Sequence, residues 1–325
     1  MFPDLLRSLL FPPLLACGLL APGWLPGRAL GTPSGAIGSL IGSAALLLNL
    51  LLAFDAIGVP LRLGNVAAGI AALCLVLGGV AVAQQRRAGA TATDGPPFAA
   101  KRSGFIWVKH QGLLVAAALG LGAITLRATL NPLSGFDVIF RWDFLARQMV
   151  RAGSLRFYPA VSDNDFLYYG WCDGIAPLVS SLYFWSYLSL GRIAAWATTP
   201  VVVAQALLLF WVVWKLATRR GGPAAGAAAC GVFATSSVSL WGVAMGQETG
   251  LTALCLAAMF LFLDRHADAP RDRWLVWASI AAGTGALARE YGLAFIALGG
   301  LALAGRRTAI RGWLEFGLPA VAVAL

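Results

Sequence analysis

The sequence predicts an all-α polytopic membrane protein, and three observations lead to this class. Hydrophobic residues make up 59% of the 325 residues and charged residues only 12%, whereas about a quarter of the residues of a typical soluble protein are charged. The apolar residues also form long runs, and Lys and Arg occur in short clusters between them. Since each crossing of a bilayer takes about 20 apolar residues, we expect about ten transmembrane helices.

The basic clusters predict how the chain is oriented. The net charge of +10 could suggest a nucleic-acid partner, but basic residues between apolar runs mark the cytoplasmic loops of a membrane protein. We therefore expect membrane lipids as partners and no nucleic acid. The segments expected in the cytoplasm are 84–110, 215–220, 265–273 and 306–311.

The longest basic loop divides the chain into two parts. Residues 1–110 hold three apolar runs and this loop, and residues 111–325 begin with the run Gln111–Leu130. Because the last run is still apolar at Leu325, we expect a C-terminally truncated piece of a longer chain. The other runs are Leu5–Leu20, Ala36–Val59, Leu63–Ala83, Ala194–Leu216, Ala224–Ala244, Leu251–Leu263, Trp274–Leu287, Gly292–Ala304 and Trp313 onward.

The segment 131–191 is the expected catalytic loop. It mixes charged with aromatic residues and holds five of the fourteen acidic residues, and functional residues concentrate on loops held by a rigid scaffold. Since the preceding run starts in the cytoplasm, this long first loop of the second part should lie on the non-cytoplasmic side.

The predicted orientation has two further consequences. The apolar piece Gly174–Leu190 should not cross the membrane, and its aromatic residues predict an interfacial helix along the surface or a re-entrant helix. The stretch Trp274–Ala304 should cross twice in legs of about 15 residues, shorter than a full crossing. Arg289 and Glu290 then lie at the outer turn, where short legs imply a water-filled recess.

Carboxylates in the expected loop are the candidate catalytic groups, because a carboxylate can act as general base toward a hydroxyl or an amine. On residue types alone, Asp137 is either this base or the N-cap of a helix. Asp143 lies four residues before Arg147 and can pair with it on one helix face, which suggests a structural role. Both aspartates are candidates for the base.

Residues at the expected outer turns are the candidate binding groups. Arg289 suits a phosphate, and its alternative role is an ion pair with Glu290 or Glu248. Glu248 begins an apolar run, where the electrostatics of a helix start also explains an acidic residue.

The cysteines and histidines predict neither a disulfide framework nor a metal site. The five cysteines show no CxxC spacing. His110 and His266 are far apart in the sequence, and a structural or catalytic zinc site takes three or four protein ligands. We expect no cofactor, and a divalent metal is left open.

Several motifs follow one another in a characteristic order. After the early acid of the outer loop comes a Tyr-x-x-x-Asp-x-x-x-Pro-Leu stretch, which begins at Tyr169 and has Asp173 at its fifth position. The segments Ala234–Ser237 and Gly285–Glu290 follow. In this order, over about residues 113–307, the chain resembles the GT-C membrane glycosyltransferases, the superfamily of protein mannosyltransferases and aminoarabinose transferases.

The resemblance implies that a sugar is transferred from a polyprenyl-phosphate carrier on the non-cytoplasmic side. It implies an acidic catalytic base early in the first outer loop, which matches Asp137 first and Asp143 second. Asp173 matches an acidic position that shapes the pocket, and Arg289 matches a basic position near the carrier phosphate. The expected binding site also includes Tyr169, Glu248 and Glu290.

We therefore predict a multi-pass glycosyltransferase that moves a hexosyl or pentosyl group from a polyprenyl-phosphate sugar to a glycan, lipid or protein acceptor. The expected location is a bacterial inner membrane, with the active site outside the cytoplasm. One alternative is a transporter or flippase of a lipid-linked precursor, for which Asp55 and Arg127 are possible intramembrane charges. The other is a non-catalytic membrane assembly subunit.

Overall fold

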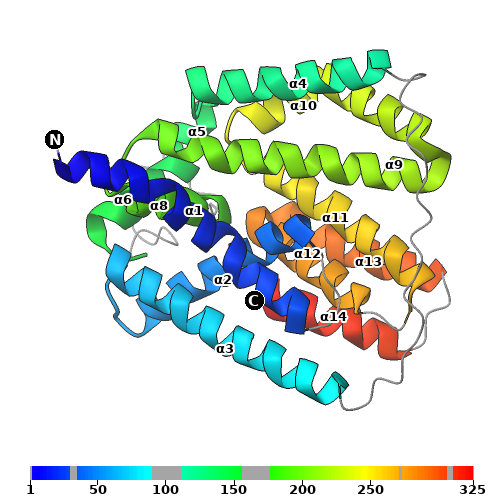
Figure 1. Ribbon diagram of the computed structural model, residues 1–325, viewed down its shortest axis with the longest axis horizontal. Helices are drawn as coiled ribbons and strands as arrows, with labels where there is room; N and C mark the ends of the chain where they lie inside the picture. The colour runs from blue at the N-terminus through cyan, green and yellow to red at the C-terminus, as the bar shows by residue number, and fades with distance from the viewer. Residues whose placement is uncertain are drawn as a thin grey trace.

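The computed structural model describes residues 2–29, 35–89, 111–155, 176–270, 273–305 and 310–324. Over these ranges every regular element is a helix, which confirms the all-α class. Figure 1 shows the helices as one bundle, with the short helices α5 (Phe136–Phe140), α6 (Trp142–Ala152) and α8 (Leu178–Leu190) grouped at one end. We refer to this end, where the described parts of the expected outer loop lie, as the loop end.

Six of the described helices are long and apolar enough to cross a membrane, which supports an integral membrane protein. Two shorter apolar helices, α12 (Trp274–Ala288) and α13 (Leu293–Gly305), correspond to the short legs predicted from the orientation. The expected number of about ten crossings stays a prediction. The six longer helices are α1 (Phe2–Ala29), α2 (Gly35–Ala56), α3 (Leu63–Gly89), α4 (Gln111–Leu130), α9 (Thr199–Thr235) and α11 (Thr249–Asp268).

One long helix, α9, covers parts of two runs that were expected to be separate. Gly222 has φ 76° and ψ −175°, so the helix is broken there, and Pro223 begins a second leg. This leg packs against α4, where a Cβ atom on Gly120 would come within 2.5 Å of the Ala234 side chain. The expected run Ala224–Ala244 is itself interrupted at Ser236, which caps α10 (Ser237–Ala244).

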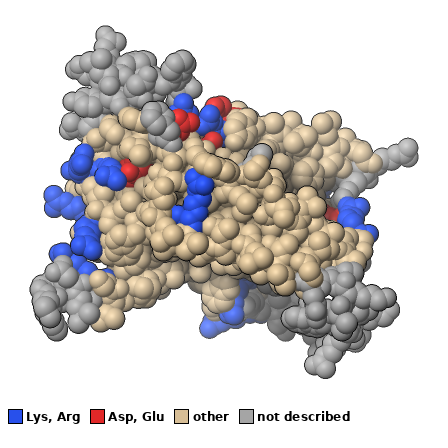
Figure 2. Space-filling view, turned by 90° about the horizontal axis from the view of Figure 1, so that it is seen from above, with Lys and Arg blue, Asp and Glu red and all other residues tan. Residues whose placement is uncertain are grey.

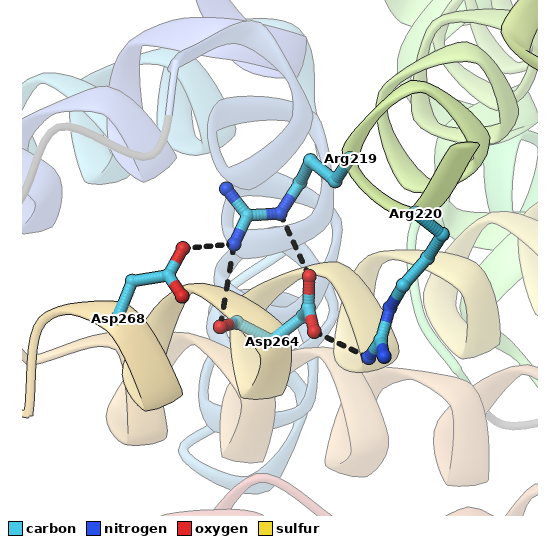
Figure 3. Close-up of polar contacts among 4 residues, drawn as sticks. All are labelled: Arg219, Arg220, Asp264 and Asp268. Carbon is cyan, nitrogen blue, oxygen red and sulfur yellow. Dashed lines mark hydrogen bonds and ion pairs between the residues drawn. The ribbon is translucent and has the colours of Figure 1, made fainter. Parts of the chain in front are cut away.

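An ion-pair network fastens the first leg of α9 to the end of α11 (Figure 3). Arg219 Nε lies 2.7 Å from Asp264 Oδ2, and its Nη2 pairs with Asp268. Arg220 Nη2 lies 2.5 Å from the other oxygen of Asp264. The residues lie within or beside two basic clusters that we expect in the cytoplasm, so the structure brings these two clusters to the same end.

Asp55 links the connection between α2 and α3 to the segment that follows α6 by a hydrogen bond. It is the last residue but one of α2, and its Oδ1 accepts a hydrogen bond from Leu155 N at 2.7 Å. Leu61 N donates to Gly153 O, also at 2.7 Å. These bonds give Asp55 a structural role at a helix end.

The helix α8 is enclosed by protein on nearly all sides. Every residue of it except Leu188 is buried, and it packs against α6, α1 and α2. A helix that lies along a membrane surface has one exposed face, and α8 lacks one. This burial fits a helix lying along a free membrane surface poorly, and re-entry of the segment into the membrane stays a prediction.

The remaining elements are short or lie near the C-terminal end of the chain. The 3-10 turn η1 (Ala195–Thr198) leads into α9, and η2 (Glu290–Gly292) joins α12 to α13. The last helix, α14 (Ile310–Ala324), packs against α12. Figure 2 shows that one face of the molecule is mostly uncharged, as expected for a surface in contact with lipid, and that its acidic side chains lie next to basic ones.

Candidate active site at the loop end

Three connections meet at the loop end of the bundle. A Cβ atom on Gly135, just before α5, would lie 2.8 Å from Gln247 Nε2 in the α10–α11 loop. The next residue of that loop, Glu248, pairs with Arg289 in the α12–α13 turn. The structure therefore places the segment before Asp137 close to the two turns that carry Glu248 and Arg289, whereas residues 168–174 lie outside the described residues.

Glu248 and Arg289 form a largely buried ion pair. Glu248 Oε1 lies 3.3 Å from Arg289 Nη1, and the two side chains are 8% and 24% exposed. Arg289 Nε is also 3.3 Å from Glu290 Oε1. Both ion-pair partners predicted for Arg289 are therefore present.

The turn that carries Arg289 depends on a close backbone approach. Arg289 has an extended backbone with φ −160° and ψ 147°, which ends α12. The following turn folds back so tightly that a Cβ atom on Gly292 would lie 2.1 Å from Gly285 O. Only glycine fits there, and this fold directs the Arg289 side chain toward Glu248.

The Glu248–Arg289 pair contains two buried polar atoms that make no hydrogen bond among the described residues. Glu248 Oε2 and Arg289 Nε are buried, and neither makes a hydrogen bond within the described part of the chain. Burial raises the pKa of the Glu248 carboxyl above its ordinary value, while Arg289 and Arg141 act in the opposite direction. Buried polar atoms are normally bonded. An unbonded Glu248 oxygen beside an Arg289 Nε that has only a 3.3 Å ion pair with Glu290 is therefore an arrangement suited to a polar ligand.

Asp143 is fixed on both of its carboxylate oxygens. Its Oδ2 lies 2.6 Å from Arg147 Nε, and its Oδ1 accepts a hydrogen bond from the Tyr187 hydroxyl. The residue is only 1% exposed. The predicted pair of Asp143 with Arg147 is confirmed, and the bond to α8 is an addition that the spacing did not indicate.

Asp137 differs from Asp143 in every one of these respects. It is the second residue of α5, its side chain is exposed, and no bond joins it to another side chain among the described residues. The N-cap of α5 is Gly135, so the interpretation of Asp137 as a helix cap is wrong. An exposed carboxylate at the loop end has room to approach a substrate.

Two residues that the sequence did not single out complete the site. Tyr183 and Tyr187 lie one turn apart on α8 and are each 1% exposed. The Tyr183 hydroxyl donates to Gly246 O, and Tyr187 donates to Asp143. The sequence feature that could have indicated them is the spacing of two tyrosines four residues apart in an apolar helix, because a buried phenol needs a hydrogen-bond partner.

Two predicted binding residues, Tyr169 and Asp173, lie outside the described residues.

The described residues contain no group of three or more His, Cys, Asp or Glu side chains placed to hold a metal ion. The side chains described at the loop end include carboxylates, arginines and buried phenols. This set can accept a proton and can compensate the negative charge of a phosphate.

Comparison with known proteins identifies the part of the chain that contains Glu248 and Arg289. The sequence model of the dolichyl-phosphate-mannose-protein mannosyltransferase family matches residues 176–325. No curated protein and no solved structure matches the chain. The matched range, a little under half of the chain, confirms the resemblance of this integral membrane protein to the GT-C glycosyltransferases, which use a lipid-linked sugar donor.

Proposed function

We propose that the protein transfers a sugar from a polyprenyl-phosphate donor to an acceptor on the non-cytoplasmic side of the membrane. The observation that carries this proposal is the pair Glu248–Arg289, which is largely buried, incompletely hydrogen-bonded and close to the segment of Asp137. The family match supports glycosyl transfer in general, and these side chains supply the groups for the specific reaction.

In the proposed reaction Asp137 is the general base. It takes the proton of the acceptor hydroxyl or amine as the acceptor atom attacks the anomeric carbon of the donor. The bond from that carbon to the phosphate oxygen breaks, and its electron pair leaves with the phosphate. Arg289 compensates the charge on the departing phosphate. A phosphate leaves without the general acid that hydrolysis of a glycosidic bond requires.

The environment of each aspartate supports Asp137 rather than Asp143 as the base. A base must reach the proton that it removes. Asp143 is enclosed and already bonded on both oxygens, whereas Asp137 is exposed. We therefore assign a structural role to Asp143 and place Glu248, Glu290 and Arg289 at the donor phosphate and sugar.

The environments of Asp55 and Arg127 speak against the transporter alternative. A transporter predicts charges that work within the membrane. Asp55 accepts a hydrogen bond from a backbone amide at a helix end. Arg127 lies in the last turn of α4, and its guanidinium is 3.8 Å from the centre of the Trp241 ring on α10. Both charges thus have structural partners.

A transfer assay tests the proposed function. The full chain, purified in lipid nanodiscs, is incubated with acceptor extracts and a panel of radiolabelled polyprenyl-phosphate hexoses and pentoses. We expect label in a product from one donor class and release of polyprenyl phosphate in equal amount. Absence of transfer from every donor, in preparations that are folded by circular dichroism, would overturn the proposal.

A further inference from the structure

The helix α8 holds both halves of the proposed site through two hydroxyl groups. Tyr183 and Tyr187 are separated by four residues and therefore lie on one face of the helix. Tyr183 reaches the α10–α11 loop at Gly246, and Tyr187 reaches α6 at Asp143. Burial, reinforced by the nearby Asp143 carboxylate, raises the pKa of both phenols above their ordinary value. Both hydroxyls therefore remain protonated donors.

The bond from Tyr183 fixes the loop that carries Glu248. Gly246 has φ 75°, a left-handed conformation that favours glycine. A Cβ atom there would lie 2.9 Å from the Tyr183 hydroxyl, so the tyrosine closes tightly over the turn. Glu248 follows two residues later as the N-cap of α11. The position of its carboxylate against Arg289 thus depends on the bond at Gly246.

The bond from Tyr187 fixes the segment that carries Asp137. Asp143 lies in the first turn of α6, and α5 precedes this helix with only Arg141 between them. The backbone of Arg141, with φ −113° and ψ −90°, is neither helical nor extended. The direction of α5 therefore depends on how the start of α6 is held, and the buried Tyr187–Asp143 bond holds it.

We propose that Tyr183 and Tyr187 are positioning residues with separate effects, Tyr183 on the binding of the sugar donor and Tyr187 on the step in which the base removes the acceptor proton. This assignment rests on the proposed function, because it takes Glu248–Arg289 as the donor site and Asp137 as the base. Neither tyrosine reaches the reacting atoms in this account.

The test compares Tyr183→Phe and Tyr187→Phe with Ser186→Ala in the full chain. Ser186 is a matched control, because it is buried on the same helix but its hydroxyl donates only to Leu182 O within that helix, at 2.9 Å. Loss of one hydrogen bond is worth about a factor of ten. We expect Tyr183→Phe to raise the donor KM about tenfold and Tyr187→Phe to lower kcat about tenfold, with the control at wild-type values.

A second readout needs no substrate and separates this proposal from the proposed function. Amide hydrogen exchange should increase at residues 245–248 in Tyr183→Phe and at residues 141–147 in Tyr187→Phe, with little change in the control. If wild-type protein transfers no sugar, the proposed function fails, and the exchange data still decide the positioning roles. Equal exchange changes in both segments for either variant, or kcat and KM unchanged in both, would overturn the proposal.

Discussion

Asp137→Asn should lower the rate of sugar transfer by about 10²- to 10⁴-fold, the usual contribution of a general base. The amide keeps the size of the side chain but cannot accept the acceptor proton. Because Asp137 is exposed and bonds to no other described side chain, the unfolding temperature should stay the same. The measurement is kcat for transfer together with thermal unfolding of the purified chain.

Two comparison variants make this result specific. Glu315→Gln removes another surface carboxylate, paired with Arg311 at 2.8 Å on α14, and should retain full activity. Asp143→Asn should lower stability as well as activity, because it weakens a buried bond. Wild-type kcat in Asp137→Asn, together with a stable but inactive Asp143→Asn protein, would transfer the role of base to Asp143.

Arg289→Lys should lower kcat/KM for the donor by about 100-fold, mainly through KM. Lysine keeps the positive charge but lacks the planar fork that binds phosphate oxygens in pairs. The ammonium group can still face Glu248, so the fold should persist. The matched control is Arg220→Lys at the other end of the bundle, where the side chain is 70% exposed and pairs with Asp264. A donor KM equal to that of the wild type would remove Arg289 from the phosphate site.

Removal of the charge at Arg289 should have a different consequence. Arg289→Met leaves the buried Glu248 carboxylate without its partner, a change that costs about 3–5 kcal/mol when a pair is fully buried. The cost should be smaller here, because the Arg289 side chain is 24% exposed. Adding Glu248→Gln to this variant should recover stability without recovering activity.

Much of the fold follows from the length and flanks of apolar runs. The run Gln111–Leu130 forms α4 with the predicted bounds, and the turn at Arg289 separates α12 from α13 as the orientation required. The bounds of α9 and α10 were less predictable. The break at Ser236 lies in a short polar stretch, Thr235–Ser237, inside the apolar run, and a local cap sets its position.

The burial of α8 could not be read from its composition. Tyr183, Phe184 and Trp185 suit a membrane interface and a packed core equally, because aromatic side chains are amphipathic or apolar in both settings. Only the packing partners decide between them. A Cβ atom on Gly18 of α1 would lie 2.2 Å from Trp185 Nε1, so α1 passes directly over this helix.

In the candidate site, too, some side-chain contacts could be predicted from the sequence and others could not. The pair Asp143–Arg147 was predictable because it lies within one helix turn. The partner of its other oxygen, Tyr187, is 44 residues away along the chain, and no periodicity relates the two. The pair Glu248–Arg289 was predictable only as an alternative, since the orientation placed both at outer turns without a distance between them.

Sided labelling of single cysteines tests the central claim most directly, namely that the segment of Asp137 and the turn of Arg289 share the non-cytoplasmic face. Asp137→Cys, Glu290→Cys and Arg220→Cys are made in a background without the five native cysteines, and intact cells are treated with a membrane-impermeant maleimide. All three positions are exposed. Labelling of 137 and 290 in intact cells, and of 220 only after permeabilisation, is the predicted result. Labelling of 137 and 290 from opposite sides would contradict the account.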